Sequence, residues 1–143
     1  MRQSGRVHWI TVVGLLGIVA LVVLLFAGKE SPANVASRFM SALARHDVEE
    51  LTSLSFYEGD PEQLRKGWDY AVNVAGKHFL FRWSLETVKE SGPDTAAVKL
   101  KVERALGPNS FPENFDLPLV LTKDGWRVDV RGISRNMFPG LPR

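Results

Sequence analysis

The chain has 143 residues, of which 45% are apolar, and its formal net charge is +2 at pH 7. Arg2 and Arg6 account for this excess, since basic and acidic residues are equal in number after Gly28, so the composition argues against electrostatic binding of a nucleic acid. Cysteine is absent, which excludes disulfides, thiolate metal sites and a lipid-modified cysteine.

The first feature along the chain is an apolar run from Ile10 to Ala27, in which Thr11 is the only polar residue. As a helix this run would be about 27 Å long, close to the hydrocarbon thickness of a bilayer. The basic residues Arg2 and Arg6 precede it, and Trp9 stands where an interfacial anchor belongs, which favours a cytoplasmic N-terminus. The sequence therefore predicts an uncleaved signal-anchor.

The segment boundaries follow from this run. We expect a short cytoplasmic tail over residues 1–8, a transmembrane helix over residues 9–28 in contact with the lipid bilayer, and an extracytoplasmic domain over residues 29–143. A cleaved signal is the first alternative, although cleavage after Ala27 or Gly28 would place a bulky residue where a small one is preferred. A buried core helix is the second, although the run is apolar on every side.

Each of the helices predicted after the run begins at a residue that can cap its N-terminus. Ser31 precedes a proline, and Asp47 precedes Glu50 at capping-box spacing. Asp60 is likewise a capping residue, followed by a proline and, three positions later, by Gln63, before a third apolar stripe. Gly76 stands where the C-cap of the third helix belongs. The apolar faces comprise Val35, Ala36, Phe39, Met40 and Leu43, then Leu51 and Leu54, then Leu64, Trp68, Ala71, Val72 and Ala75.

From Phe79 onward, apolar residues no longer recur at helical spacing but at every second position. This alternation predicts about four strands with one apolar face each. Leu54–Tyr57 is a further short candidate strand, and Ser134–Arg143 has no period, so we expect it to be a loose tail. The order predicts an α+β fold in which three N-terminal helices pack on a curved antiparallel sheet. The inward positions are Phe79, Phe81, Trp83 and Leu85; Ala96, Val98, Leu100 and Val102; Phe115, Leu117, Leu119 and Leu121; and Trp126, Val128 and Val130.

Three stretches carry a family resemblance: "SPANVASRFMSALARHDVEELTSL", "DPEQLRKGWDYAV" and "LVLTKDGWRVDV". Over about residues 31–133 the chain resembles the nuclear transport factor-like cone, also called the cystatin-like or SnoaL-like superfamily. The resemblance implies the fold rather than one function, because the superfamily holds isomerases, dehydratases, ligand carriers, dimerising modules and membrane-complex subunits. The chain is most similar to single-pass members whose cone lies outside the cytoplasm.

Enzymes of this superfamily place ionisable residues inside the cone, and no predicted inward strand position of this chain holds one. Asp69 is the best remaining acid, at the border of the third helix's buried face; a solvated helix flank is its alternative reading. Candidate ligand-binding residues near the cone mouth are Trp68, Asp69, Tyr70, His78 and Trp83. No metal site or cofactor is predicted, since the histidines lack ligand spacing and no phosphate loop is present.

We therefore expect a non-catalytic interaction or accessory module, held at the cell membrane by one span, whose outer sheet face binds a protein partner or a second copy. The neutral domain and the apolar inward positions support this expectation. One alternative is a tethered binder of a small apolar ligand in the cone. The other is an isomerase- or dehydratase-like enzyme that uses Asp69 with Tyr70 or His78.

Overall fold

The computed structural model describes residues 11–21, 30–104 and 107–143, and the chain divides into two compact units, Met1–Glu30 and Ser31–Arg143. In the first unit, residues 11–21 are helical and exposed, while the predicted tail over residues 1–8 and the rest of the predicted span lie outside the described residues. Among the residues described, no helix combines the length and apolar character that crossing a membrane requires.

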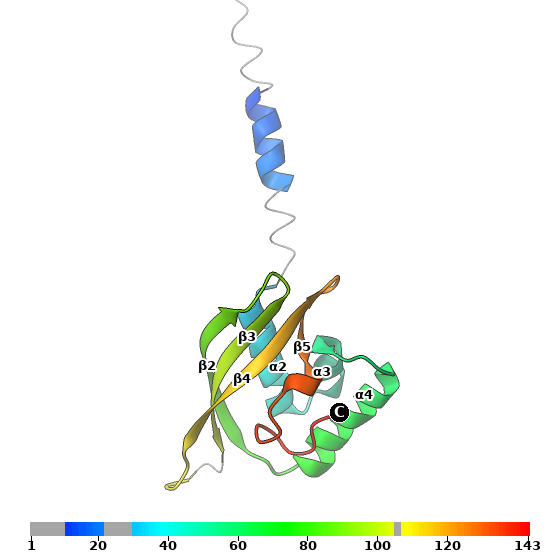
Figure 1. Ribbon diagram of the computed structural model, residues 1–143, viewed down its shortest axis with the longest axis vertical. Coiled ribbons are helices and arrows are strands. Elements are labelled where there is room, and N and C mark those ends of the chain that lie inside the picture. Colours follow the sequence, from blue (N-terminus) through cyan, green and yellow to red (C-terminus); the bar gives the residue numbers. More distant parts are fainter. Residues whose placement is uncertain (1–10, 22–29, 105–106) are drawn as a thin grey trace, which may run out of the picture. The chain divides into compact units, whose positions relative to one another are not determined.

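The helices of the second unit begin where the sequence predicts. The Ser31 side chain accepts a hydrogen bond from the N–H of Asn34 at 3.2 Å, and Asp47 and Asp60 cap the next two helices in the same manner. The first helix ends because His46 takes the left-handed conformation, with φ of 58°. The elements are α2 (Pro32–Arg45), α3 (Val48–Leu54) and α4 (Pro61–Tyr70), which continues as the π-helix η1 (Ala71–Ala75) (Figure 1).

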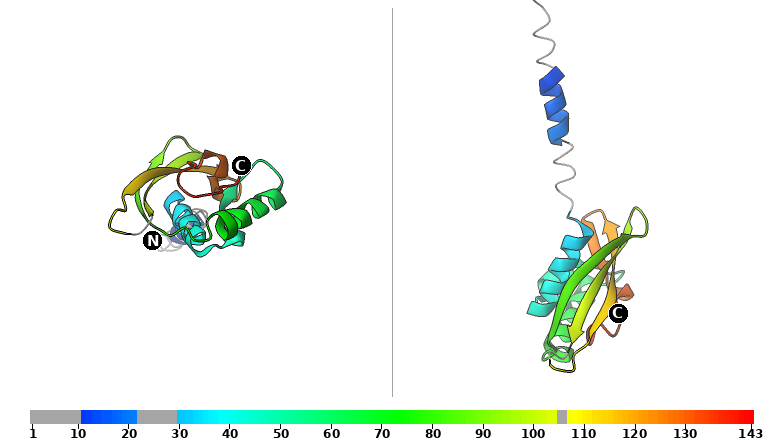
Figure 2. Two further views of the ribbon diagram at one scale, coloured as in Figure 1. Left: turned by 90° about the horizontal axis from the view of Figure 1, so that it is seen from below. Right: turned by 90° about the vertical axis from the view of Figure 1, so that its left-hand side faces the viewer.

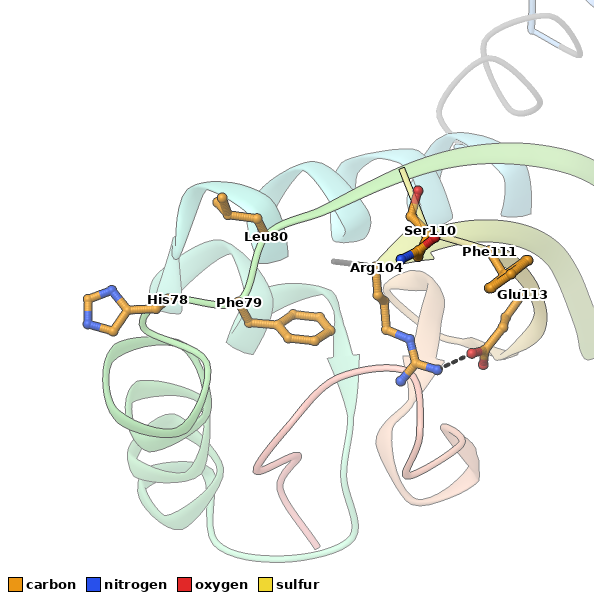
Figure 3. Close-up of a pocket in the computed structure, with 8 residues that line it drawn as sticks. His78, Phe79, Leu80, Arg104, Ser110, Phe111 and Glu113 are labelled. Atoms are coloured by element: carbon orange, nitrogen blue, oxygen red, sulfur yellow. Dashed lines mark hydrogen bonds and ion pairs between the residues drawn. The ribbon is translucent and has the colours of Figure 1, made fainter. Parts of the chain in front are cut away.

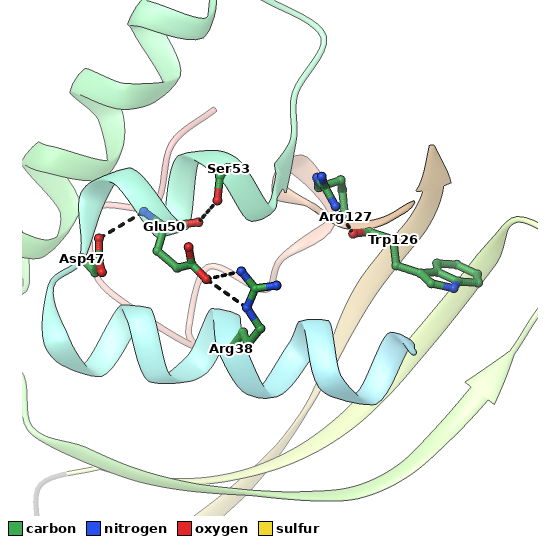
Figure 4. Close-up of polar contacts among 6 residues, drawn as sticks. All are labelled: Arg38, Asp47, Glu50, Ser53, Trp126 and Arg127. Carbon is green, nitrogen blue, oxygen red and sulfur yellow. Dashed lines mark hydrogen bonds and ion pairs between the residues drawn. The ribbon is translucent and has the colours of Figure 1, made fainter. Parts of the chain in front are cut away.

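The predicted capping box of α3 forms only in part. Asp47 accepts a hydrogen bond from the N–H of Glu50, but the Glu50 side chain does not return it and instead pairs with Arg38 of α2 (Figure 4). The N–H of Asp47 donates to the carbonyl of Ala42 at 2.9 Å. Glu50 therefore joins α3 to α2, and a second ion pair between Arg65 and Glu49 joins α4 to α3.

The sheet of the described residues has five strands in the order β1-β5-β4-β3-β2. Its neighbours are antiparallel except for β1 and β5, which pair in parallel, so the sheet is mixed rather than antiparallel as predicted. The short strand expected near Leu54–Tyr57 is β1. Its partner strand is distant in the sequence, because Ser55 stands opposite Val128. The strands are β1 (Ser55–Phe56), β2 (Phe81–Glu90), β3 (Thr95–Arg104), β4 (Pro112–Thr122) and β5 (Gly125–Asp129).

The sheet curves around α2, and both views in Figure 2 show the helices gathered on its concave side. This side carries the predicted inward residues, and Val98, Leu100 and Leu117 are fully buried there. Trp68 of α4 is also fully buried: its ring packs edge-on against Phe39 at 5.6 Å, and its Nε1 donates to Ser55 Oγ at 3.0 Å. The interior is therefore filled by apolar side chains from the helices and the sheet.

The expectation of a loose tail over Ser134–Arg143 is wrong. Met137 and Phe138 are almost completely buried, and the Phe138 ring packs edge-on against Phe79 at 5.2 Å. The backbone carbonyl of Arg143, the last residue, accepts a hydrogen bond from the hydroxyl of Tyr57 at 2.9 Å. The tail lacks a period because it is not a regular element, yet its apolar residues fill space between the sheet and α4 that the helices leave open.

Gly76 is the C-cap of the π-helix η1 that ends the third helix, as predicted, and its N–H donates to the Ala71 carbonyl, but a left-handed conformation is not the reason for a glycine here. Its φ is −101°, which any residue can adopt. A β-carbon at this position would lie 2.4 Å from the Phe138 ring and 2.7 Å from the Ala71 carbonyl oxygen. The small residue thus makes room for the tail at the end of η1.

Candidate functional site

The structure does not bring the five predicted ligand-binding residues together. Trp68 lies in the core, and Trp83 is half-buried on the inner face of β2. Asp69 and Tyr70 lie on the exposed side of α4, where Asp69 accepts a hydrogen bond from Asn73 at 2.8 Å and Tyr70 is 55% exposed. His78 is exposed on the segment that leads to β2. Because Trp68 has no exposed surface, it does not share a surface site with Asp69 and Tyr70.

Of the five, His78 lines an open pocket of about 780 Å³, and Trp83 lines a separate, smaller one of about 120 Å³. The larger pocket lies where the segment before β2 meets the end of β3 and the start of β4 (Figure 3). Phe79 points into this region, whereas Leu80 and Phe111 are 69% and 77% exposed. The full lining is His78, Phe79, Leu80, Arg104, Asn109, Ser110, Phe111 and Glu113.

Arg104 is the main polar group of this pocket, and both terminal nitrogens of its guanidinium are hydrogen-bonded. Its guanidinium pairs with Glu113, donates to the Asn136 carbonyl at 2.6 Å, and lies 5.8 Å from the centre of the Phe115 ring. The pocket therefore combines apolar side chains with a fixed ion pair. Such a combination is typical of pockets that hold amphipathic molecules. Ser110, which also lines the pocket, donates its hydroxyl to the Glu103 carboxylate at 2.5 Å.

The sequence reasoning missed this pocket because its lining joins the segment before β2 to a distant loop between β3 and β4. Phe111 stands in the Gly-, Pro- and Asn-rich stretch between β3 and β4, where no alternation marks an inward or outward side. A large apolar residue in such a polar loop was the available signal, since most turn residues are small or polar.

The described residues offer no other chemical centre. They contain no group of three His, Cys, Asp or Glu side chains that could hold a metal ion, and no polar or charged side chain among them is buried. The pKa of Arg65 is raised because its side chain is hydrogen-bonded to Glu49, but this pair is exposed and joins two helices. Charge in the described domain thus lies on its surface.

The outer face of the sheet carries much of that charge in cross-strand pairs. Lys101 contacts Glu86 at 3.1 Å, Arg82 contacts Glu103 at 3.5 Å, and Lys99 stands directly opposite a carboxylate, Asp116, on the neighbouring strand. Opposite charges in such positions stabilise a sheet modestly and keep its surface solvated. Neutral residues, including Ala97, Pro118 and Val120, occupy neighbouring positions on this face.

Comparison with known proteins supports the fold and leaves the function open. No protein-family model matches the chain, and no curated protein sequence matches it. A solved structure named a putative calcium/calmodulin-dependent protein kinase type II association domain, from Thiobacillus denitrificans, aligns with a TM-score of 0.53 and 13% identity. The alignment covers 70% of this chain and 90% of that one, so the two share an α+β fold.

Two further solved structures carry names from the superfamily that the sequence resembles. An NTF-2 like protein of unknown function from Shewanella oneidensis has a TM-score of 0.49 and 10% identity over 67% of this chain and 89% of its own. A ketosteroid isomerase-like protein from Erwinia carotovora has a TM-score of 0.48 and 15% identity over 66% and 85%. Identities this low show at most a common fold, and no activity is transferred from them.

Proposed function

We propose that the chain is a non-catalytic interaction or accessory module, anchored by a single N-terminal span with its domain outside the cytoplasm. The observation that carries the non-catalytic part is the interior of the described domain, where no polar or charged side chain is buried. A proton-transfer enzyme needs an ionisable group in contact with its substrate. Phe39, Trp68 and Phe138 occupy the interior instead.

The anchor is proposed from the sequence. The run from Ile10 to Ala27 is long enough for a bilayer, and the arginines before it favour a cytoplasmic N-terminus. The apolar side chains of the helical residues 11–21 are exposed, which leaves them available to lipid. Cleavage is disfavoured, because cutting after Ala27 or Gly28 would place Leu25 or Phe26, respectively, where a small residue is preferred.

The outer face of the sheet is the proposed contact surface for a protein partner. Its paired charges and neutral neighbours resemble the mixed polar surface that transient protein interfaces use. The structural neighbour from Thiobacillus denitrificans is named an association domain, a description of that protein which here motivates an association role. The electrical neutrality of the chain after Gly28 fits a protein partner better than a nucleic acid.

The second candidate function is binding of a small apolar or amphipathic ligand. The observation that favours it is the open pocket of about 780 Å³ beside Phe79, Leu80 and Phe111. Ligand pockets of this size in proteins combine apolar side chains with a few polar groups. The Arg104–Glu113 pair would supply those polar groups at the rim.

Native mass spectrometry of the full chain, extracted gently in detergent, tests these proposals in one measurement. An intact chain without a bound small molecule, alone or with a protein partner, is the result we expect. A chain that begins at Gly28 or Lys29 would contradict the anchor. A defined small mass retained by the wild type and lost from a Phe111→Ala variant would instead make ligand binding the leading function.

A further inference from the structure

The strand β2 ends the sheet and leaves one long side without a partner strand. It spans ten residues, Phe81–Glu90, and within the part of the chain that the structure describes no strand pairs with its outer side. The opposite edge is formed by β1, which has only two residues. A long edge strand presents a row of backbone donors and acceptors that another strand can use.

A bulge divides β2 into two stretches. Its register with β3 shifts between Leu85 and Thr87, so Glu86 is the additional residue, and its carboxylate reaches Lys101 on the outer face. Bulges twist a strand and disrupt its ladder locally, although β2 pairs with β3 again from Thr87 to Glu90. Any further strand that adds to this edge is therefore restricted to a short ladder, which we place at Arg82–Glu86.

We propose that a second copy of this chain occupies the edge, with the two β2 strands antiparallel about a two-fold axis at Ser84. In this register Arg82 of each copy stands opposite Glu86 of the other. Across the outer faces the charges then alternate in sign from Glu103 and Arg82 of one copy to Glu86 and Lys101 of the other. A two-fold axis repeats this complementary contact on both sides of Ser84.

The inner face of the same edge supplies the apolar contact. Trp83 and Leu85 are half-buried, whereas their partners on β3, Val102 and Leu100, are fully buried. The proposed register sets Trp83 of each copy opposite Leu85 of the other. Aromatic and aliphatic side chains in directly opposed positions stabilise a sheet, and their exposed area would be removed from water.

The pairing would join the two sheets into one and double the outer face. This consequence rests on the proposed function, since it enlarges the surface offered to a protein partner. The pairing itself does not depend on the anchor or on that partner, because it uses only β2 of each copy. Its test can therefore fail while the proposed function stands, and the reverse also holds.

A cysteine scan tests the axis directly, because the natural chain contains no cysteine. Directly opposed residues of antiparallel strands have Cα atoms about 4.5–5.5 Å apart, within the roughly 4.4–6.8 Å that disulfides span. We expect a full-length Ser84→Cys variant, purified in detergent and mildly oxidised, to form a covalent dimer. The matched control is Ser91→Cys, also exposed, whose two copies would lie on the order of 45 Å apart along the ladder.

Charge exchange between copies tests the register. In the Ser84→Cys background, Arg82→Glu and Glu86→Arg should each lower the dimer yield about fivefold, because each opposes like charges twice in the dimer. A mixture of the two variants, with different tags, should recover the yield as a mixed dimer, since both contacts are then complementary. A structural effect within one copy would not produce this recovery.

Two results would overturn the proposal. One is equal cross-linking of Ser84→Cys and Ser91→Cys; the other is a mixture of charge variants that yields no more mixed dimer than either variant alone. Cross-linking of an Asp116→Cys variant in place of Ser84→Cys would instead assign the self-contact to the outer face of the sheet. Circular dichroism of each variant confirms that its fold is intact.

Discussion

Two neighbouring strands with the same alternating pattern differ in how deeply they are buried. Leu85 of β2 and Leu100 of β3 are direct register partners on the inner face, yet Leu100 is fully buried and Leu85 is only half-buried. Val98 is likewise fully buried, while its partner Val88 is 42% exposed. Alternation thus determines the side of the sheet to which a residue points, and the position of its strand determines how much covers it.

The contrast has a structural cause at each end of β2. Phe81, at its start, packs against Phe138 of the C-terminal tail at 6.0 Å, so the tail covers this end. Val88, near its other end, has β3 on one side only. An edge strand with partial covering is less stable than the strands in the middle, and it is also the part of the sheet that remains available for pairing.

The largest predicted effect concerns the cover at the start of β2. Replacing Phe138 by Ala should lower the free energy of unfolding by about 3–5 kcal/mol, because it leaves a cavity beside Phe79 and Phe81. Urea unfolding of the full chain in detergent, followed by tryptophan fluorescence, measures this loss. Arg135→Ala, at an exposed tail position, is the control and should change stability by less than about 0.5 kcal/mol. A similar small change for both variants would mean that the tail does not support the core.

The second prediction compares the two leucines that face each other. Leu100→Ala should cost about 3 kcal/mol, whereas Leu85→Ala should cost about 1 kcal/mol, since the half-exposed site leaves a smaller cavity and loses less buried area. The same unfolding measurement ranks them. The comparison applies to the chain diluted below self-association, because a second copy on the β2 edge would cover Leu85 and bring the two losses closer together. Equal losses in the diluted chain would show that β2 is as well covered as β3 within one copy.

The third prediction tests the space that Gly76 leaves for the tail. Gly76→Ala should destabilise the chain by about 1–3 kcal/mol, because the new β-carbon would lie against the Phe138 ring and the Ala71 carbonyl. In a Phe138→Ala background the cost should shrink, since the clash with the ring is removed. Additive losses in the double variant would exclude this contact as the cause.

The fourth prediction concerns the N-cap of α3, which lies outside the sheet. Asp47→Ala should cost about 1 kcal/mol, because the N–H of Glu50 loses its partner at the start of α3. Asp47→Asn keeps a capping oxygen and should cost much less. Thermal unfolding of the three chains provides the ranking, and equal melting temperatures for wild type and the Ala variant would contradict the role of the cap.

The smallest effect is expected at the residue that sequence reasoning chose as the best acid. Asp69→Asn should change stability by less than about 0.5 kcal/mol, because the side chain is exposed and contacts only Asn73 among its described hydrogen bonds. Native mass spectra of wild type and variant should show the same species. A small molecule retained by one and lost by the other would restore Asp69 as a candidate functional residue.

Helix starts and strand faces could be predicted because they depend on residues close together in the sequence. The N-caps Ser31, Asp47 and Asp60 act on N–H groups two or three residues away, and each starts a helix as expected. The inward faces of β3 and β4 follow from alternation and are correct for Val98, Leu100 and Leu117 among others. These features need only neighbours in sequence.

The candidate site was less predictable, because it depends on which distant segments meet. Trp68 and Asp69 are adjacent in sequence, but one is in the core and the other in solvent, and the pocket beside His78 is completed by a loop more than thirty residues away. The parallel pairing of β1 with β5 has the same origin. Periodicity contains no information on such contacts.

By itself the sequence determined the N-terminal apolar run, the helix starts, the two faces of each main strand and the absence of cysteine chemistry. Each follows from composition or from interactions within a few residues. Only the tertiary structure decided that β2 is an edge, that the aperiodic tail with Phe138 belongs to the core, and that Glu50 joins two helices. Burial is a property of contacts between distant segments, so it becomes definite only once those segments have packed together.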